Sequence, residues 1–337
     1  MTASAAMVAE FDDVAGWTAE AVEQLGQRHA IPATCRGSAS PAALAWLAEA
    51  CELAAGSTLL DVGAGAGGPA AWAAERFGVR PILLEPMPAA GRAAARLFGL
   101  PVIAADGRRI PLRTGSVDAA WCLGVLCTVR DKAAVLAEIH RVLKPGASLG
   151  LLVVVARGPQ TLPVPDGNHF PTEAELRALL AGAGFELLDQ VGPPGPPPRS
   201  WSRRAEQVAA VVATRHRAHP AYALAAHQGE RFTHLFASGQ IGVRLLHAVS
   251  RASTQVTDGG MMSAPRDQDG FLHELEVEVE AEVSLVEASR PGEVAELPIT
   301  DWLFDPTDAE REEIGLRGLL DAVEVLEDGA RPDDHVA

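Results

Sequence analysis

Along the first 191 residues, short apolar runs alternate with segments in which apolar residues recur at helical spacing. Six short apolar runs are each typical of a buried strand: TLLDVG (58–63), RPILLEP (80–86), LPVIAAD (100–106), VDAAWCLG (117–124), SLGLLVVVA (148–156) and FELLDQV (185–191). Between them lie segments with apolar residues at helical spacing, as in KAAVLAEIHRVLK (132–144). Strands that alternate with helices of this length indicate βαβ units and a mostly parallel sheet.

Capping residues mark where two of the helices begin. Ser40 stands before Pro41 and an apolar-periodic segment, which is the usual order at a helix N-terminus. Thr172 with Glu175 forms a capping box for the helix that follows. We also expect helices across residues 14–55, ahead of the first strand.

Beyond residue 191 the alternation stops at the segment VGPPGPPP (191–198), which cannot form regular structure. Two helical stretches follow within residues 199–242, and VRLLHAVS (243–250) is suited to a seventh strand that returns to the sheet. The predicted fold is therefore α/β: a Rossmann-like, seven-stranded, mostly parallel sheet with flanking helices and a helical insertion.

The residues after about 252 have a different character. ELEVEVEAEV (274–283) alternates strictly between glutamate and apolar residues, as in a half-buried strand, and an acidic amphipathic helix follows. We expect a main domain over 1–252 and a small acidic α+β appendage over 253–337. The acidic strand face is interpreted as a solvated surface, with binding of a basic partner as the alternative. An exposed strand edge is also one route to a homodimer.

Charge is distributed unevenly between these parts. The net charge is −16, but residues 267–337 alone carry −18, so residues 1–266 are close to neutral at +2. An acidic segment repels phosphate backbones, which argues against a nucleic-acid substrate.

Composition argues against a membrane protein. The longest apolar run of the central region, LGLLVVVA (149–156), is too short to cross a bilayer, and the first residues lack the pattern of a signal peptide. We expect a cytoplasmic protein. The four cysteines show no C-x-x-C pair and the histidines no metal-type spacing, so no metal site is predicted.

The glycine loop after the first strand, LLDVGAGAGG (59–68), fits two nucleotide-binding patterns. Gly63, Gly65 and Gly68 match the dinucleotide fingerprint G-x-G-x-x-G. Asp61 with the same glycines matches the loop used by enzymes that bind S-adenosylmethionine. A carboxylate at the end of this strand would repel a pyrophosphate but suits the cationic methionine part of S-adenosylmethionine.

Two further acids follow at strand ends. Glu85, 24 residues after Asp61, suits the two ribose hydroxyls of either cofactor and discriminates little. Asp106 ends the third predicted strand, where it can accept from an adenine amino group.

Taken in order, LLDVGAGAGG, ILLEP, AADGRRIPL, SVDAAWCLGVLCTV and HRVLKPGASLGLLVVV resemble the class I S-adenosylmethionine-dependent methyltransferases that act on small molecules and on quinone or natural-product precursors. The resemblance covers about residues 35–191. It implies that the cofactor is S-adenosylmethionine and that the helical insertion, about 199–242, forms a lid. It implies the following contacts: Gly63, Ala64 and Gly65 with the methionine part, Glu85 with the ribose, Pro86 and Met87 with the adenine face, Asp106 and Gly107 with the adenine edge, and Leu123 with the adenine amino group.

Two residues outside these motifs are candidates for the chemistry. His169, in the loop after the fifth strand, lies at the sheet edge where ligands bind in α/β folds, and is a candidate base. Arg36 precedes the core and is a candidate partner for the methionine carboxylate. The insertion carries five arginines within 199–217 against one glutamate, which favours either an anionic substrate or a solvated surface.

The predicted function is transfer of a methyl group to a small organic acceptor. Three alternatives stay open at this point. One is a different use of the same cofactor, such as cyclisation or decarboxylation. Another is a non-catalytic protein that binds S-adenosylmethionine or a partner. The third is a protein methyltransferase whose acidic segment recruits a basic partner.

Overall fold

The computed structural model describes residues 3–35, 39–158 and 161–251. Arg36 and the predicted appendage, 253–337, lie outside them. Ten helical segments are described: α1 (Ala3–Leu25), the 3-10 helix η1 (Gln27–His29), α2 (Ala30–Thr34), α3 (Pro41–Ala50), α4 (Gly68–Phe77), α5 (Pro88–Phe98), α6 (Lys132–Val142), α7 (Glu173–Gly182), α8 (Arg199–His216) and α9 (Pro220–Ala237). The strands are β1 (Thr58–Val62), β2 (Arg80–Leu84), β3 (Val102–Ile103), β4 (Val117–Leu123), β5 (Leu143–Ala156), β6 (Phe185–Val191) and β7 (Ile241–Ser250).

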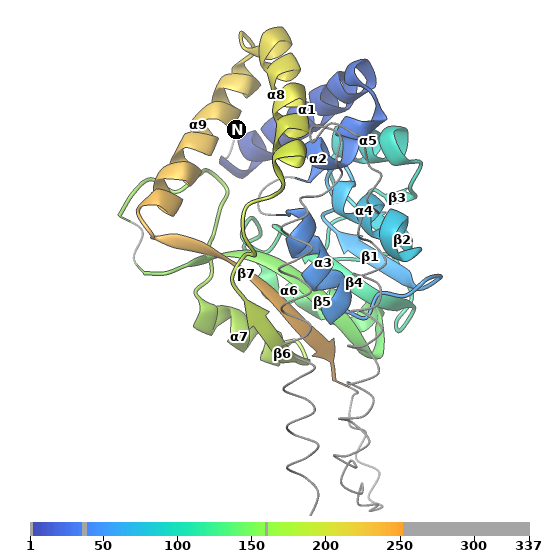
Figure 1. Ribbon diagram of the computed structural model, residues 1–337. Helices are drawn as coiled ribbons and strands as arrows, with labels where there is room; N and C mark the ends of the chain where they lie inside the picture. The colour runs from blue at the N-terminus through green and yellow to red at the C-terminus, as the bar shows by residue number, and fades with distance from the viewer. Residues whose placement is uncertain (1–2, 36–38, 159–160, 252–337) are drawn as a thin grey trace, which may run out of the picture. The chain divides into compact units, whose positions relative to one another are not determined.

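The strands form one seven-stranded sheet in the order β3-β2-β1-β4-β5-β7-β6 (Figure 1). The five strands from β3 to β5 pair in parallel, whereas β7 lies antiparallel between β5 and β6. The strand order reverses between β1 and β4, and ligands of open α/β sheets bind at such a switch point, outside the carboxyl ends of the strands. The prediction of a mostly parallel, seven-stranded Rossmann-like fold is confirmed.

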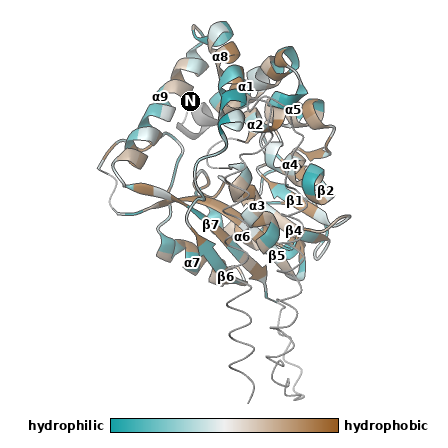
Figure 2. Ribbon diagram, viewed as in Figure 1, coloured by the Kyte–Doolittle hydropathy of each residue, from teal (hydrophilic) through white to brown (hydrophobic). Residues whose placement is uncertain are grey.

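Helices cover both faces of the sheet, which explains why the strands read as continuous apolar runs. In β5, Leu149, Leu151 and Val153 pack on the face covered by α6 and α7. The alternate residues Leu152 and Val154 pack on the face that α3 and α4 cover. Figure 2 shows the resulting concentration of hydrophobic residues along the central strands.

A separate apolar cluster lies at the glycine-loop end of the sheet. It joins residues of α1 (Ala19, Val22), α5 (Ala93, Leu97) and α8 (Val208, Val212) with Ala66 of the glycine loop itself. The inserted helix α8 is therefore packed next to the loop that follows β1, although the two are more than 130 residues apart in the sequence.

The capping predictions are confirmed. The Ser40 hydroxyl accepts from the Ala43 N–H at the start of α3. Thr172 and Glu175 form the reciprocal capping box of α7.

Several predicted boundaries were wrong. The first helix begins at Ala3, well before residue 14. The third strand is only Val102–Ile103 because the chain leaves the sheet there, so Asp106 lies three residues past its end. Helix α6 ends at Val142 rather than at residue 144, and β5 starts at Leu143 rather than at residue 148, because Leu143 already pairs with Val117 of β4.

Among the residues that the structure describes, no helix combines the length and the apolar character needed to cross a bilayer.

Candidate functional site

The glycine loop turns sharply between β1 and α4. Gly63, Gly65 and Gly67 all have positive φ, between 56° and 83°, which glycine adopts at little cost. A Cβ on Gly63 would lie 2.4 Å from Val125 Cγ2, and one on Gly68 would lie 2.8 Å from the Cys35 nitrogen. The backbone of this loop is thus packed closely against the loop after β4 and against the end of α2.

Glu85 ties the end of β2 to the glycine loop. The Gly65 N–H donates to its Oε2 (2.7 Å), and the Met87 N–H donates to its Oε1 (2.9 Å). The residue is 2% exposed. Burial and the Asp12 carboxylate raise the pKa of Glu85, partly offset by these two hydrogen bonds. Each oxygen keeps a free lone pair, so the carboxylate can still accept two further bonds.

Asp61 is a buried carboxylate at the end of β1. It is 1% exposed, and its Oδ2 has no hydrogen-bond partner within the described part of the chain. Burial and the charge of Glu85 raise the pKa of Asp61 to about 7. An unpartnered buried acid of this kind needs a donor or a cation to be stable in its ionised form.

Two buried thiols lie near Asp61. Burial, and after it the Asp61 charge, raise the pKa values of Cys35 at the end of α2 and of Cys122 in β4. Both thiols are therefore neutral near pH 7 and act as small apolar groups. They leave Asp61 without a counter-charge.

These observations fit S-adenosylmethionine, the cofactor that the resemblance implies. Asp61 offers a buried anion for the ammonium of the methionine part. Glu85 offers two oxygens for the ribose hydroxyls, and the glycines let the ligand approach the backbone closely. A pyrophosphate at the same place would face two carboxylates whose charges already repel each other, so the dinucleotide interpretation does not fit.

The adenine-side residues lie on the neighbouring loops. Pro86 and Met87 lie between β2 and α5, and Met87 is the N-cap residue of α5. The Asp106 carboxylate pairs with Arg108, whose Nη2 lies 2.7 Å from Oδ2, and this interaction lowers the pKa of Asp106. Asp106 is therefore ionised and remains free to accept more bonds.

Two residues predicted to contact the adenine lie beside β1, the strand that precedes the glycine loop. Gly107 approaches β1, where an added Cβ would meet Val62 Cγ1 at 3.0 Å. Leu123 is the last residue of β4, next to β1 in the sheet. Leu123, Gly107 and the glycine loop thus lie at the same edge.

His169 lies at this edge as predicted. Its backbone N–H donates to the Cys127 carbonyl (2.6 Å), which joins the loop after β5 to the loop after β4. Burial and the positive charges of Arg130 and Lys132 lower the pKa of its imidazole. The ring is therefore neutral near pH 7 and can accept a proton.

Contacts that the sequence did not indicate fix helix α9 over the His169 loop. Arg231 Nη1 lies 3.0 Å from Asp166 Oδ1, and the Asp166 N–H donates to Gln228 Oε1 (2.9 Å). The rings of Phe170 and Phe232 meet edge to face at 5.6 Å. The insertion thus holds the loop that carries the candidate base.

A second missed contact joins α1 to the cofactor side of the sheet. Asp12 Oδ1 accepts from the N–H groups of Ala89 (2.6 Å) and Ala90 (3.0 Å), and so caps α5 from another helix. Local sequence gives no signal for a cap that comes from 77 residues away. Arg36, the predicted carboxylate partner, is outside the described residues, and its role stays a prediction.

Comparison with known proteins agrees with this geometry. Residues 60–151 match the family described as "Methyltransferase domain". The chain is 32% identical over 176 residues to a ubiquinone biosynthesis O-methyltransferase of Pseudomonas paraeruginosa, a match that spans 45% of this chain and 74% of that protein. It is 30% identical to Methyltransferase GfsG of Streptomyces halstedii over 44% of this chain and 62% of that protein, so it spans less than two thirds of GfsG.

Solved structures share the fold. The [4+2]-cyclase SpnF is 27% identical, with a TM-score of 0.51, over 62% of this chain and 80% of that one. The cyclopropane synthase MmaA2 of Mycobacterium tuberculosis, at 18% identity and a TM-score of 0.51 over 62% of this chain and 83% of that one, shows likeness of fold only.

The matched region contains the glycine loop, Glu85, Asp106 and β4, which together form the cofactor edge described above. The match to the O-methyltransferase, at 32% identity over 74% of that protein, shows the family. The chain belongs to the class I S-adenosylmethionine-dependent methyltransferase superfamily.

Proposed function

We propose that this protein transfers the methyl group of S-adenosylmethionine to a hydroxyl group of a small organic acceptor. The observation that carries the proposal is the pair of buried acids, Asp61 and Glu85, on either side of the glycine loop. The names of two relatives, a ubiquinone biosynthesis O-methyltransferase and Methyltransferase GfsG, support methyl transfer, and the first supports oxygen as the accepting atom.

The chain's own residues hold the cofactor in place. Glu85 is already oriented by two backbone N–H groups, so it accepts from the ribose hydroxyls without rearranging. Asp61 accepts from the ammonium, which gives its Oδ2 the partner it lacks. When bound, S-adenosylmethionine supplies an activated methyl group on a sulfonium. Positioning then accounts for much of the rate.

His169 is the proposed general base for the acceptor hydroxyl. Its lowered pKa keeps the ring neutral and able to take the proton as the hydroxyl oxygen attacks. Phe170 beside it and Phe232 of α9 provide an aromatic surface for an apolar acceptor. The proposal therefore places a phenolic or similarly acidic hydroxyl between this surface and the cofactor.

The test is a transfer assay with purified full-length protein, S-adenosylmethionine and a panel of phenols, catechols and hydroxylated polyketide-like acceptors. The expected result is S-adenosylhomocysteine formation matched by an acceptor product heavier by one methylene unit, located on oxygen by NMR. Methylation on nitrogen or carbon only would contradict the choice of oxygen.

Rearrangement of an acceptor without release of S-adenosylhomocysteine would instead indicate cyclisation. The [4+2]-cyclase SpnF shares this fold, so the assay follows acceptor consumption as well as methyl release. The relatives named as methyltransferases make methyl transfer the expected outcome.

The remaining assignments are part of the same proposal. We propose a cytoplasmic enzyme whose substrate is a small molecule, not a nucleic acid or a membrane. A homodimer and a lid function for about residues 199–242 stay predictions. Sedimentation of the full chain and limited proteolysis with and without S-adenosylhomocysteine test them separately.

A further inference from the structure

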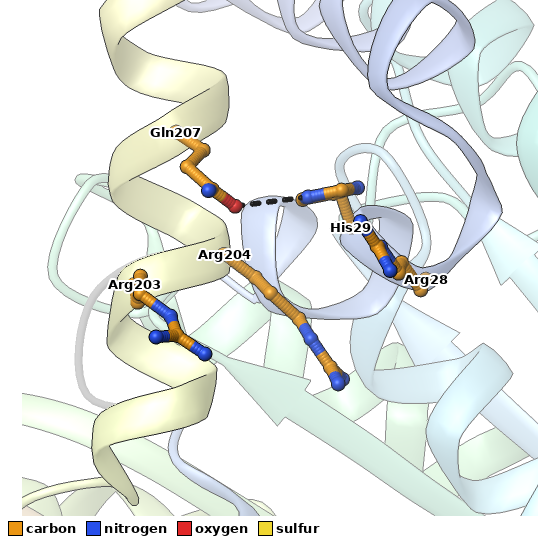
Figure 3. A pocket seen from close by; sticks show the side chains of 5 residues that line it. All are labelled: Arg28, His29, Arg203, Arg204 and Gln207. Atoms are coloured by element: carbon orange, nitrogen blue, oxygen red, sulfur yellow. Dashed lines mark hydrogen bonds between the residues drawn. The ribbon is translucent and has the colours of Figure 1, made fainter. Parts of the chain in front are cut away.

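A cavity of about 200 Å³ lies between the N-terminal segment and helix α8, away from the two acids of the cofactor edge. Its lining residues are Arg28 and His29 of η1 and Arg203, Arg204 and Gln207 of α8. Figure 3 shows the Arg204 side chain extending from α8 into the space beside the segment that carries Arg28 and His29, whereas the Arg203 side chain lies closer to α8. Three arginines thus line one cavity, although they come from two elements that are about 175 residues apart in sequence.

None of these three arginines forms an ion pair or a side-chain hydrogen bond with any residue that the structure describes. Some arginines elsewhere on the surface are paired, as Arg96 is with Glu23 and Arg231 with Asp166. Glu206 is the single acid of α8, and in the part of the chain that the structure describes it forms no ion pair with Arg203 or Arg204. Like charges that meet without a counter-ion repel, so an anion would stabilise the arrangement.

The walls of the cavity are held together by a buried histidine. His29 is 2% exposed; its Nδ1 lies 3.0 Å from the Gly26 carbonyl oxygen, and its Nε2 lies 3.0 Å from the side-chain amide of Gln207. This contact joins η1 to α8 and fixes the spacing between Arg28 and the two α8 arginines. The two walls are therefore held together, and the exposed side chains of Arg28 and Arg203 extend from them.

The cavity is connected to the cofactor edge by one short helix. α2 begins directly after His29, is five residues long, and ends at Thr34 and Cys35, which contact Gly68 behind the glycine loop. At about 1.5 Å per residue, the two sites are separated along α2 by roughly 8 Å.

We propose that this cavity is a binding site for a compact oxyanion, a phosphate or carboxylate group. Guanidinium groups recognise both through paired, charge-assisted hydrogen bonds, and the volume accommodates such a group with some water. Two sources share this chemistry: an acidic group on the methyl acceptor, or a free inorganic anion. The proposal that the bound group belongs to the acceptor rests on the proposed function. The proposal that the cavity binds an oxyanion does not.

The first experiment measures anion binding directly. Full-length protein saturated with S-adenosylhomocysteine is titrated calorimetrically with inorganic phosphate and with pyrophosphate at constant ionic strength. The double variant Arg203→Gln/Arg204→Gln is expected to bind about tenfold more weakly, or worse. Arg217→Gln, at the C-cap of α8 and outside the cavity, is the matched control and should bind as the wild type does.

Arg28→Gln removes a charge from the opposite wall and keeps the test valid should the double variant misfold. Wild-type affinity for phosphate in both Arg28→Gln and the double variant, with melting temperatures unchanged, would overturn the proposal. So would the absence of saturable binding below about 10 mM in the wild type.

The second experiment separates the two sources. Methyl transfer to a dihydroxybenzoic acid and to the dihydroxybenzene without the carboxylate is measured with increasing phosphate. If phosphate competes with the dihydroxybenzoic acid but leaves transfer to the dihydroxybenzene unchanged, the site binds the acidic group of the acceptor. Phosphate binding that leaves both reactions unchanged assigns it to a free anion. Failure of all methyl transfer would refute the proposed function yet leave the calorimetric result standing.

Discussion

The cofactor edge and the helical layer of α1, α8 and α9 differ in how they are built. The cofactor edge comes mostly from one continuous stretch, residues 58–87, whose buried acids are oriented by nearby backbone groups. The helical layer brings together residues far apart in sequence, as in the contact of His29 with Gln207, and presents arginine and aromatic side chains. The residues proposed to hold the cofactor thus lie close together in sequence, whereas those proposed to contact the acceptor meet only through long-range packing.

The largest expected effect on the cofactor edge comes from removing Glu85, the proposed hydrogen-bond acceptor for the ribose hydroxyls. Glu85→Ala is expected to raise the Kd for S-adenosylhomocysteine about a thousandfold, since two hydrogen bonds to a charged group are lost at roughly 1.5–3 kcal/mol each. Calorimetric titration measures the change. Glu23→Ala, which removes an exposed carboxylate paired with Arg96, is the control and should leave the Kd unchanged.

Removing the candidate base should affect turnover instead of cofactor binding. His169→Ala is expected to lower kcat about a hundredfold at pH 7, within the range for general-base catalysis, with an unchanged Kd for S-adenosylhomocysteine. Steady-state kinetics and calorimetry separate the two quantities. His227→Ala, an exposed histidine of α9, provides the comparison. Equal kcat values for the two variants would rule out a base role for His169.

The raised pKa of Asp61 predicts how cofactor affinity depends on pH. Below pH 7 the free protein holds Asp61 protonated, and this proton must leave before the ammonium binds. Affinity is therefore expected to fall about tenfold for each pH unit below 7 and to level off above it. Titration in two buffers with different ionisation enthalpies detects the released proton. In Asp61→Asn the affinity should be lower and this pH dependence absent.

The smallest expected effect concerns the clamp between α9 and the His169 loop. Arg231→Ala removes a partly exposed ion pair with Asp166, which contributes at most about 1 kcal/mol. We expect a melting temperature lower by a few degrees and a KM for the acceptor about threefold higher. Arg177→Ala, at a weak surface contact with Gln190, serves as the control. A changed cofactor Kd instead would show that the helical layer also acts on the cofactor edge.

The same contrast explains what could be predicted from the sequence. The strand pattern, the glycine loop, Asp61 and Glu85 follow from neighbouring residues, so sheet type and cofactor were accessible. The cap that Asp12 places on α5 and the meeting of Arg28 with Arg203 and Arg204 depend on tertiary packing. No periodicity or motif marks such pairs in a single chain. The predicted end of β3 was wrong for a related reason, because apolar residues near the edge of a sheet need not pair with a neighbouring strand.

The antiparallel pairing of β6 with β7 has a consequence for engineering. The chain leaves the sheet after Val191, forms α8 and α9, and returns at Ile241 to a strand in which Leu245 pairs with Val191. The excursion thus starts and finishes on adjacent strands, and its ends are joined by the sheet itself. Changes in the length of residues 192–240 therefore need not disturb the pairing of the two strands.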